Sequence, residues 1–295
     1  MNGYFRPVLG RLPLLIRKHQ TSASGRTGRY YRSSQEYLSG DFSGACHFGY
    51  TPPGQPFHLE TALRAMEQEL GKALALPHDS LVLDAGCGYG RVAATLADSP
   101  FCLNVVGVDL VPERLAEAHR YIESRGVSHR VELLNANYCF LPIEDGTVSA
   151  VFTMETLVHA DPLEKALAEF WRVLKPGGRL VLFEYCVPSR DSVDPLRQWI
   201  AGKIAYHTGM ASIERFTHDS FPILLGGANF ENLTVSDIGP CVWPTWRWLF
   251  RRALCEYWAA ALCGRFNWSN LAGALMIWPN RRRLGYKIVT ATKPT

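Results

Sequence analysis

The sequence of 295 residues predicts an α/β protein with a doubly wound, Rossmann-like sheet. Short apolar runs of strand length alternate with segments whose apolar residues recur at helical spacing. One of these runs, residues 81–85, enters a glycine-rich turn, and a helical pattern begins after it at Arg91. A second apolar run, residues 105–110, carries a carboxylate near its end. This order indicates parallel strands joined by helices.

The glycine-rich turn has the sequence LVLDAGCGYGR over residues 81–91. Gly86, Gly88 and Gly90 allow the backbone to contact a ligand, and the start of the next helix offers N–H donors to it. The spacing is D-x-G-x-G-x-G, whereas dinucleotide-binding turns have G-x-G-x-x-G. Asp84 would repel a pyrophosphate and attract an ammonium group. We therefore expect a nucleotide-like ligand here, or else a turn that only closes a strand–helix unit.

The elements around this turn follow from the same patterns. Residues 57–76 have apolar side chains at helical spacing and predict a leading helix beside the sheet. Residues 105–110 predict the second strand, and Asp109 near its end could accept hydrogen bonds from both hydroxyls of a ribose. Asp109 could also cap the following helix, residues 112–124, which opens favourably with Pro112. The two roles are compatible.

Residues 130–185 predict a strand, a loop, a strand, a helix, a turn and a strand, in that order. The helix covers residues 162–174, and the sequence Lys-Pro-Gly-Gly at 175–178 ends it before the last apolar run. The simple alternation stops after this part. We expect an irregular to helical segment, a helix and two strands, at residues 186–214, 215–230, 232–239 and 284–293.

Between the last two predicted strands, residues 241–280 form a Trp-rich insertion. It contains six of the eight tryptophans in the chain, at Trp243, Trp246, Trp248, Trp258, Trp268 and Trp278. A hairpin needs only a few linking residues, so this insertion must build a structure of its own, which we expect to be helical. It could form the wall of an apolar substrate pocket, or a helical subdomain with an ordinary aromatic core. It could also form a helix that lies on a membrane surface, since Arg247, Arg251 and Arg252 adjoin the apolar rings.

Composition is that of a globular enzyme, with 47% apolar and 20% charged residues. Because no apolar run reaches about 18 residues, no membrane span is predicted. The eight cysteines are scattered and include no C-x-x-C pair. This pattern predicts neither a metal site nor a disulfide framework, and it indicates a reducing compartment such as the cytoplasm.

Charge is distributed unevenly along the chain. Residues 1–35 hold seven Lys/Arg and no Asp/Glu, residues 36–240 hold 15 and 26, and residues 241–295 hold nine and one. The basic ends could bring the protein to an anionic membrane surface, or they could be solvated without a partner. No nucleic-acid motif accompanies them, so no nucleic-acid partner is expected. We expect residues 1–35 to be a basic arm that is disordered, lid-forming or a mitochondrial targeting segment.

The D-x-G-x-G-x-G turn resembles the first motif of the class I S-adenosylmethionine-dependent methyltransferases, in which this turn holds the methionine part of the cofactor. The resemblance implies S-adenosyl-L-methionine as cofactor and a seven-stranded sheet of order 3-2-1-4-5-7-6. An acidic residue commonly contacts adenine in these enzymes at the position of Asn137, whose carbonyl could accept from the adenine amino group. The cofactor contacts implied in this chain are Asp84, Gly86, Cys87, Gly88, Gly90, Asp109, Leu110, Asn137 and Tyr138.

Three further segments look like the sterol and tocopherol C-methyltransferases: ACHFGYTPPGQPF, METLVHADP, and WP…LAGALMI…LGYKIVTATKP near the end. This resemblance covers residues 36–295 and implies one methyltransferase domain with substrate-lid insertions at 186–214 and 241–280. It also implies methyl transfer to a small lipophilic acceptor, with carbon as the preferred atom. The alternatives are N- or O-methylation of an alkaloid or polyketide-like metabolite, and a descendant that binds the cofactor without transferring its methyl group.

Glu155 and His159 follow the fourth predicted strand, at the edge where ligands bind in such sheets. Either could remove a proton from the acceptor, because histidine titrates near neutral pH and burial raises the pKa of a glutamate toward it. Glu155 could instead order its loop, and His159 could be a capping or core residue. The residues expected to line the acceptor pocket are His47, Tyr50, Trp243 and Trp246.

Overall fold

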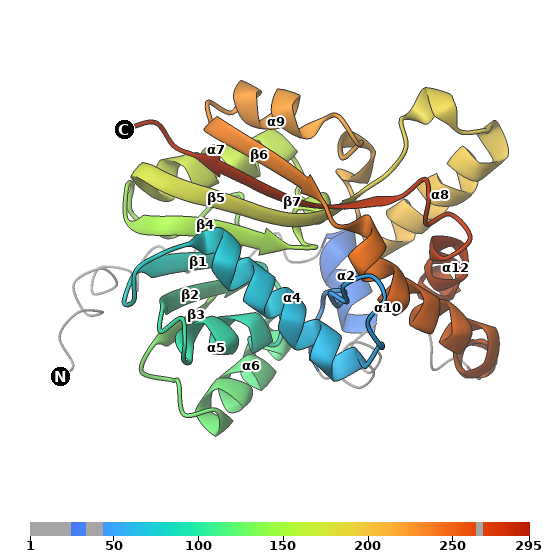
Figure 1. Cartoon of the computed structure of the whole chain (residues 1–295), viewed down its shortest axis with the longest axis horizontal. Helices are drawn as coiled ribbons and strands as arrows, with labels where there is room; N and C mark the ends of the chain where they lie inside the picture. The colour runs from blue at the N-terminus through green and yellow to red at the C-terminus, as the bar shows by residue number, and fades with distance from the viewer. Residues whose placement is uncertain (1–24, 34–43, 264–267) are drawn as a thin grey trace.

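The structure, a computed structural model, describes residues 25–33, 44–263 and 268–295 of the chain. Its strands form a seven-stranded sheet of order β3-β2-β1-β4-β5-β7-β6 (Figure 1). The strands are β1 Leu81–Ala85, β2 Asn104–Asp109, β3 Val131–Asn135, β4 Val148–Met154, β5 Leu174–Cys186, β6 Glu231–Asp237 and β7 Gly285–Thr292. β7 is antiparallel to both of its neighbours, and the other pairs are parallel. The predicted fold class and strand order are confirmed.

The helices between residue 57 and the insertion match the expected order, and one further helix, which was not predicted, lies within the basic arm. They are α2 Arg26–Ser33, α4 Leu59–Leu74, α5 Arg91–Ala97, α6 Pro112–Ser124, α7 Leu163–Val173, α8 Pro195–Thr208 and α9 Phe221–Gly227, with a short 3-10 turn, η3, at Leu157–His159. The predicted leading helix is α4, and the helix expected over residues 162–174 is α7. α6 begins with Pro112 as expected, but its N-cap residue is Val111 and not Asp109.

One expected helix is shorter than its sequence pattern. Residues 215–230 are not helical throughout, because a 3-10 turn at Ile213–Arg215 is followed by an irregular segment before α9. α9 begins where Pro222 occupies a first-turn position and ends at a pair of glycines. The turn at residues 175–178 lies within the bounds of β5, where the pairing with β4 skips from Leu174 to Arg179. These residues therefore bulge out of the ladder.

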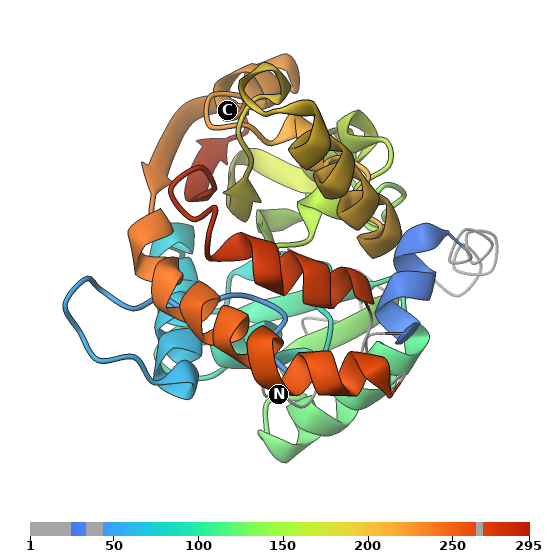
Figure 2. The ribbon, with the colours of Figure 1, turned by 90° about the vertical axis from the view of Figure 1, so that its right-hand side faces the viewer.

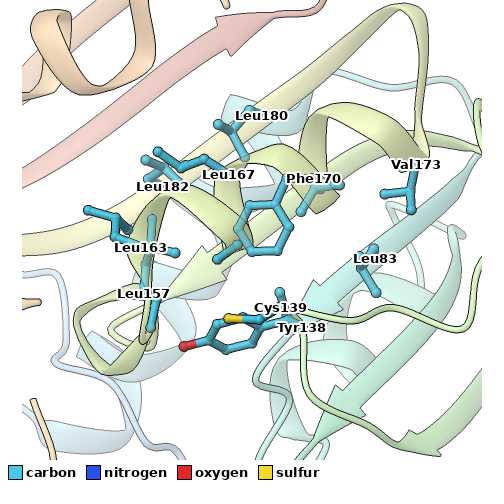
Figure 3. Close-up of a cluster of buried hydrophobic side chains, with 14 of the residues drawn as sticks. Leu83, Tyr138, Cys139, Leu157, Leu163, Leu167, Phe170, Val173, Leu180 and Leu182 are labelled. Atoms are coloured by element: carbon cyan, nitrogen blue, oxygen red, sulfur yellow. The ribbon is translucent and has the colours of Figure 1, made fainter. Parts of the chain in front are cut away.

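Helices cover both faces of the sheet, and each face has its own hydrophobic cluster. α4, α5 and α10 pack on one face, where Phe152 and Phe183 are fully buried. α7 and α9 cover the other face, and Figure 3 shows Phe170 of α7 near Leu180 and Leu182 of β5, with Tyr138 and Cys139 below it. Each such side chain contributes about 1.5–3 kcal/mol by leaving water. Burial on both faces holds the carboxyl ends of the parallel strands in fixed register.

The Trp-rich insertion between β6 and β7 is helical, as predicted. It consists of α10 Gly239–Arg252, a π-helical turn η6 Ala253–Tyr257, α11 Trp258–Leu262 and α12 Trp268–Ile277. Together with α2 and α8 it occupies one end of the molecule, which faces the viewer in Figure 2. Within the described ranges, no helix has the length and apolarity needed to cross a bilayer. Of the predicted basic arm, residues 1–24 and 34–35 lie outside the described residues.

Candidate active site

The glycine turn between β1 and α5 is shaped by the packing of its own surroundings. Gly86 has a φ of 100°, and a Cβ at this position would lie 2.7 Å from Cγ2 of Thr156. Gly90 has a φ of 73° and caps α5, and a Cβ there would lie 3.0 Å from Cβ of Ala118 in α6. Any side chain at these positions would strain the backbone and displace a neighbour. The fold itself therefore requires glycine at both places.

Asp109, at the end of β2, joins this turn to the start of α6. Its Oδ2 accepts a hydrogen bond from the N–H of Gly88 at 2.9 Å, and its Oδ1 accepts one from the N–H of Val111 at 2.8 Å. Cys87 is buried in the same turn, and burial raises the pKa of its thiol. The Asp109 carboxylate is thus held in position by backbone donors at the edge of the sheet.

A pocket of about 220 Å³, which we call the turn pocket, lies at the carboxyl ends of β1 and β2. Asn137 is partly engaged there, since its Oδ1 accepts the N–H of Cys139 at 2.8 Å. The hydroxyl of Tyr138 donates to the carbonyl of Thr156 at 2.9 Å. The predicted cofactor residues that line the pocket are Gly86, Asp109, Leu110, Asn137 and Tyr138. The other four, Asp84, Cys87, Gly88 and Gly90, form the strand end and turn beside it.

Two buried charged side chains near this pocket have polar atoms without a hydrogen-bond partner in the described part of the chain. Asp84 is 3% exposed, and its Oδ2 is unpartnered. Burial raises the pKa of this carboxyl well above its usual value. Arg114 of α6 is also 3% exposed, lines the pocket, and has Nε and Nη2 unpartnered. Because buried polar atoms without partners are costly, this pair fits a ligand that carries both an ammonium group and oxygen acceptors.

Glu155 lies just beyond β4 and is 9% exposed. Its Oε1 accepts hydrogen bonds from the N–H of Phe48 at 2.6 Å and from the hydroxyl of Tyr286 in β7 at 2.8 Å. The described residues form no hydrogen bond to Oε2. Burial raises the pKa of this carboxyl to about 8, which outweighs the effect of the two donors. At neutral pH Glu155 is therefore mostly a protonated acid.

His159, in η3, is buried between two partners. Its Nδ1 donates to the carbonyl of Gly209 at 3.0 Å, which leaves Nε2 to accept from the hydroxyl of Tyr31 at 2.7 Å. Burial lowers its pKa to about 4, so the ring is neutral. Both ring nitrogens are occupied by protein groups. The histidine orients the loop and α2, and it has no nitrogen left for a substrate in this arrangement.

The loop that carries these two residues is fixed by Glu184 of β5, a residue that the sequence analysis did not single out. Its Oε1 accepts hydrogen bonds from the N–H groups of Thr156 and Leu157 and from the hydroxyl of Thr153. Glu184 is fully buried, and burial raises its pKa to about 7. The sequence does contain an indication that Glu184 has a structural role: it is a single carboxylate in the apolar run LVLFEY, and a buried carboxylate needs a hydrogen-bond partner.

A larger cavity of about 850 Å³, which we call the cap cavity, lies among α2, α8, α10 and α12, and most of its surface is apolar. Of the residues predicted near the acceptor, His47, Trp246, Glu155 and His159 line it. Tyr50 and Trp243 do not line it, and both pack against the hydrophobic cluster on the α4 face of the sheet. Of the six tryptophans of the insertion, only Trp246 is among the lining residues.

Helix α2 lies between the two pockets. The sequence did not predict this position. Tyr31 of α2 lies with its ring 4.1 Å from the guanidinium of Arg114 and its hydroxyl on His159. Tyr31, Cys46 and His159 line both pockets. The turn pocket and the cap cavity therefore adjoin, with Tyr31 between them.

Known proteins with a similar sequence or fold are enzymes of the methyltransferase family and related cyclases. The methyltransferase domain family matches residues 83–182. A relative in Talaromyces variabilis, the S-adenosyl-L-methionine-dependent Diels-Alderase iccD, is 35% identical over 287 residues, which cover 92% of this chain and 96% of the relative. Sterol 24-C-methyltransferase erg6 of Aspergillus fumigatus is 30% identical over 54% of this chain and 41% of its own length. Among solved structures, the [4+2]-cyclase SpnF has the same fold, with a TM-score of 0.76 at 22% identity over 91% of this chain and 95% of that one.

The chain belongs to the class I S-adenosyl-L-methionine-dependent methyltransferase family. It is an S-adenosyl-L-methionine-dependent enzyme that acts on small molecules, related both to sterol C-methyltransferases and to Diels-Alderases. The unpartnered atoms of Asp84 and Arg114 fit this cofactor, which carries an ammonium group, a carboxylate and ribose hydroxyls.

Proposed function

We propose that the protein catalyses an intramolecular cyclisation of the Diels–Alder type on a small lipophilic substrate held in the cap cavity. Two findings support this proposal: the 35% identity to the Diels-Alderase iccD over 92% of this chain, and the state of the two candidate bases. His159 has both nitrogens engaged, and Glu155 is held as a neutral acid. A cycloaddition needs no base, because two carbon–carbon σ bonds form from the π electrons of a diene and an alkene within one molecule. No proton, electron or leaving group is released.

In this reaction Glu155 acts as a hydrogen-bond donor. With Oε1 accepting from Phe48 and Tyr286, the proton would reside on Oε2, and since Glu155 lines the cap cavity, Oε2–H would be the donor offered to a substrate there. A donor bonded to a carbonyl conjugated with the alkene withdraws electron density from it and lowers the barrier to cycloaddition. A buried carboxylic acid kept neutral at pH 7 is an established way to supply such a donor. The apolar cavity wall strengthens the bond by excluding water.

The cofactor is proposed to occupy the turn pocket. Asp109 would accept from the ribose hydroxyls, Asp84 would compensate the ammonium group, and Asn137 and Tyr138 would border the adenine. When bound, the group supplies a positively charged sulfonium with a transferable methyl. Arg114 and Tyr31 would close the pocket over it, since both line it and contact each other.

Methyl transfer to a lipophilic acceptor is the second candidate. One observation favours it: the two pockets share Tyr31, Cys46 and His159, so an acceptor in the cap cavity would adjoin the cofactor. This candidate needs Glu155 in its ionised form as a base for a carbon or hydroxyl acceptor. The two candidates therefore assign opposite protonation states to the same carboxyl.

The experiment uses a linear probe in which a diene is tethered to an alkene conjugated with a carbonyl, together with methyl-labelled S-adenosyl-L-methionine. Cyclisation gives an isomer of unchanged mass that has lost the diene absorbance and carries no label. Methyl transfer gives a labelled product and an equal amount of S-adenosyl-L-homocysteine, and that result would overturn the proposal.

Two variants at one position separate donor from base. Glu155→Gln keeps an oxygen for Phe48 and Tyr286 and offers N–H donors in place of Oε2–H, so we expect it to retain at least a tenth of the cyclisation rate. The cyclisation rate of Glu155→Ala should be about a hundredfold lower than that of the wild type, or lower still, because no donor remains. The rate of the wild-type enzyme should fall as pH rises above about 8, where Glu155 ionises, and the Gln variant should not show this fall. A Gln variant as inactive as the Ala variant would favour the base role.

A further inference from the structure

We propose that the outer face of η6, α11 and the start of α12 is a docking surface for an anionic phospholipid bilayer. The surface consists of Leu254, Trp258, Leu262 and Trp268, and we call it the outer stripe. It is independent of the reaction proposed above. Residues of α8, α10 and α12 line the cavity, and these helices lie at the same end of the molecule as η6 and α11, which carry the stripe (Figure 2). Docking would therefore place the substrate site beside the membrane.

The continuous helical segment of α10, η6 and α11, which we call the helical arm, has two apolar stripes, although its packing needs only one. Leu249, Ala253, Tyr257 and Ala261 recur at helical spacing and are all buried against α12 and the segment before α4. Leu254, Trp258 and Leu262 recur at the same spacing one position later, and they are 56%, 49% and 66% exposed. An ordinary aromatic core, one of the alternatives left open by the sequence, accounts for the first stripe and leaves the second unexplained.

Trp268 extends the outer stripe across to α12. Its ring meets that of Trp258 edge to face, with centroids 5.8 Å apart, and it is 53% exposed. A pair of half-exposed indoles beside leucines is typical of the level of lipid headgroups, where an amphipathic ring has its polar N–H in water and its apolar part in the acyl chains.

The charge next to the stripe selects the partner. Arg251 and Arg247 are exposed, and helical spacing places them about one and two turns before Leu254 on the same side of the arm. Glu256 is the only acid in residues 241–295, and it is paired with Arg252 at 2.7 Å. This combination of a basic first part and an apolar second part complements an anionic bilayer, which attracts each arginine and accepts the apolar side chains. An anionic lipid surface therefore fits better than an apolar protein face, which would leave the arginines desolvated.

Co-sedimentation of the full chain with phospholipid vesicles tests the proposal. We expect binding to vesicles of phosphatidylcholine mixed with phosphatidylserine and at most weak binding to phosphatidylcholine alone. Trp258→Ser combined with Leu262→Ser should weaken binding at least tenfold, because two apolar side chains no longer leave water. Arg251→Glu should weaken it about fivefold or more and reduce its sensitivity to salt.

The matched control is Ile223→Ser on α9, where the isoleucine is 78% exposed. Figure 1 shows α9 well apart from α10 and α12. This substitution removes an exposed apolar side chain of similar accessibility and should leave vesicle binding unchanged. All three variants alter exposed positions, and unfolding curves will verify that each retains the wild-type fold. Lack of binding to any vesicle would overturn the proposal, as would equal loss in the control. Light scattering gives the oligomeric state. If the wild-type protein is a dimer and the Trp258/Leu262 variant is a monomer, the stripe serves self-association instead.

Discussion

The turn pocket and the cap cavity adjoin, yet the chain builds them in different ways. The turn pocket is made by neighbouring strands and by the backbone groups that follow them, as when Asp109 accepts from the N–H of Val111 two residues later. The cap cavity depends on side chains far apart in sequence. Tyr286 reaches Glu155 over 131 positions, and Tyr31 reaches His159 over 128. A local motif thus specifies the first pocket, and only the complete tertiary structure specifies the second.

This difference predicts how each part fails. Damage to the turn should act on folding and cofactor binding together, because the same backbone serves both. Damage to the cap should alter the substrate site and leave the sheet intact. Three variants test the contrast, from the largest expected effect to the smallest.

Gly86→Ala should have the largest effect. The new Cβ would strain a backbone at φ 100° and collide with the side chain of Thr156, so we expect a loss of about 3 kcal/mol or more in the free energy of unfolding. Cofactor binding, measured by calorimetry, should be lost as well.

Gly54→Ala is the control for strain alone. Gly54 also has a positive φ, of 84°, but no heavy atom lies within 4 Å of a Cβ placed there. The free energy of unfolding of this variant should fall by about 1–2 kcal/mol, and the variant should still bind the cofactor. If urea titrations give equal losses for the two variants, the contact with Thr156 is not what makes Gly86 necessary.

Glu155→Gln should have an intermediate effect, visible as a change in how stability depends on pH. In the folded protein burial raises the pKa of Glu155 from 4.5 to about 8, so the folded state keeps a proton that the unfolded state releases. The stability associated with this group is fully present below pH 4.5 and is lost as pH rises through about 8, by a few kcal/mol in all. The Gln variant should lack that loss.

The informative range is pH 6.5 to 8. Below 6.5 the depressed pKa of His159 acts with the opposite sign, since stability from the neutral ring is lost as pH falls from 6.5 through about 4. Glu184, with a pKa of about 7, and Asp84, whose pKa is also raised, titrate in both proteins, so the difference between the two pH profiles above pH 7 reports Glu155. Denaturant unfolding at several pH values measures this, and identical slopes in both proteins above pH 7 would show that Glu155 is ionised in the fold.

Tyr31→Phe should have the smallest effect on stability, about 1 kcal/mol, because it removes a single hydrogen bond from buried His159. Since the hydroxyl donates to Nε2 and so favours the neutral ring, its removal should raise the pKa of His159 toward the ordinary value. Proton NMR titration of the histidine measures that change.

Tyr30→Phe is the matched control on the same helix, because the hydroxyl of Tyr30 donates to Oδ1 of Asn270 in α12 at 2.8 Å. Both variants should speed hydrogen exchange in α2, but only Tyr31→Phe should move the pKa of His159. A shift of similar size in both would mean that general loosening of α2 is responsible.

The sequence predicted the sheet and the turn pocket well, because alternation, glycine spacing and strand-terminal carboxylates are local signals. It located Glu155 and His159 at the correct edge but could not show their protonation states, which depend on partners from distant segments. Arg114 was missed because an arginine in PERLAEAHR reads as a solvated helix face. Trp243 and Trp246 look alike in sequence, and only the way α10 packs shows that Trp246 alone reaches the cavity.

The position of β7 between β5 and β6 also has a consequence for biosynthesis. β5 pairs with β7 along eight residues, from Arg179 to Cys186, and all the helices from α8 to α12 are translated between these two strands. While the ribosome makes that stretch, the edge of β5 presents unpaired backbone groups in an apolar strand. The nascent chain therefore passes through a stage at which a chaperone or the growing insertion must shield this edge, and Tyr286 reaches Glu155 only when that stage ends.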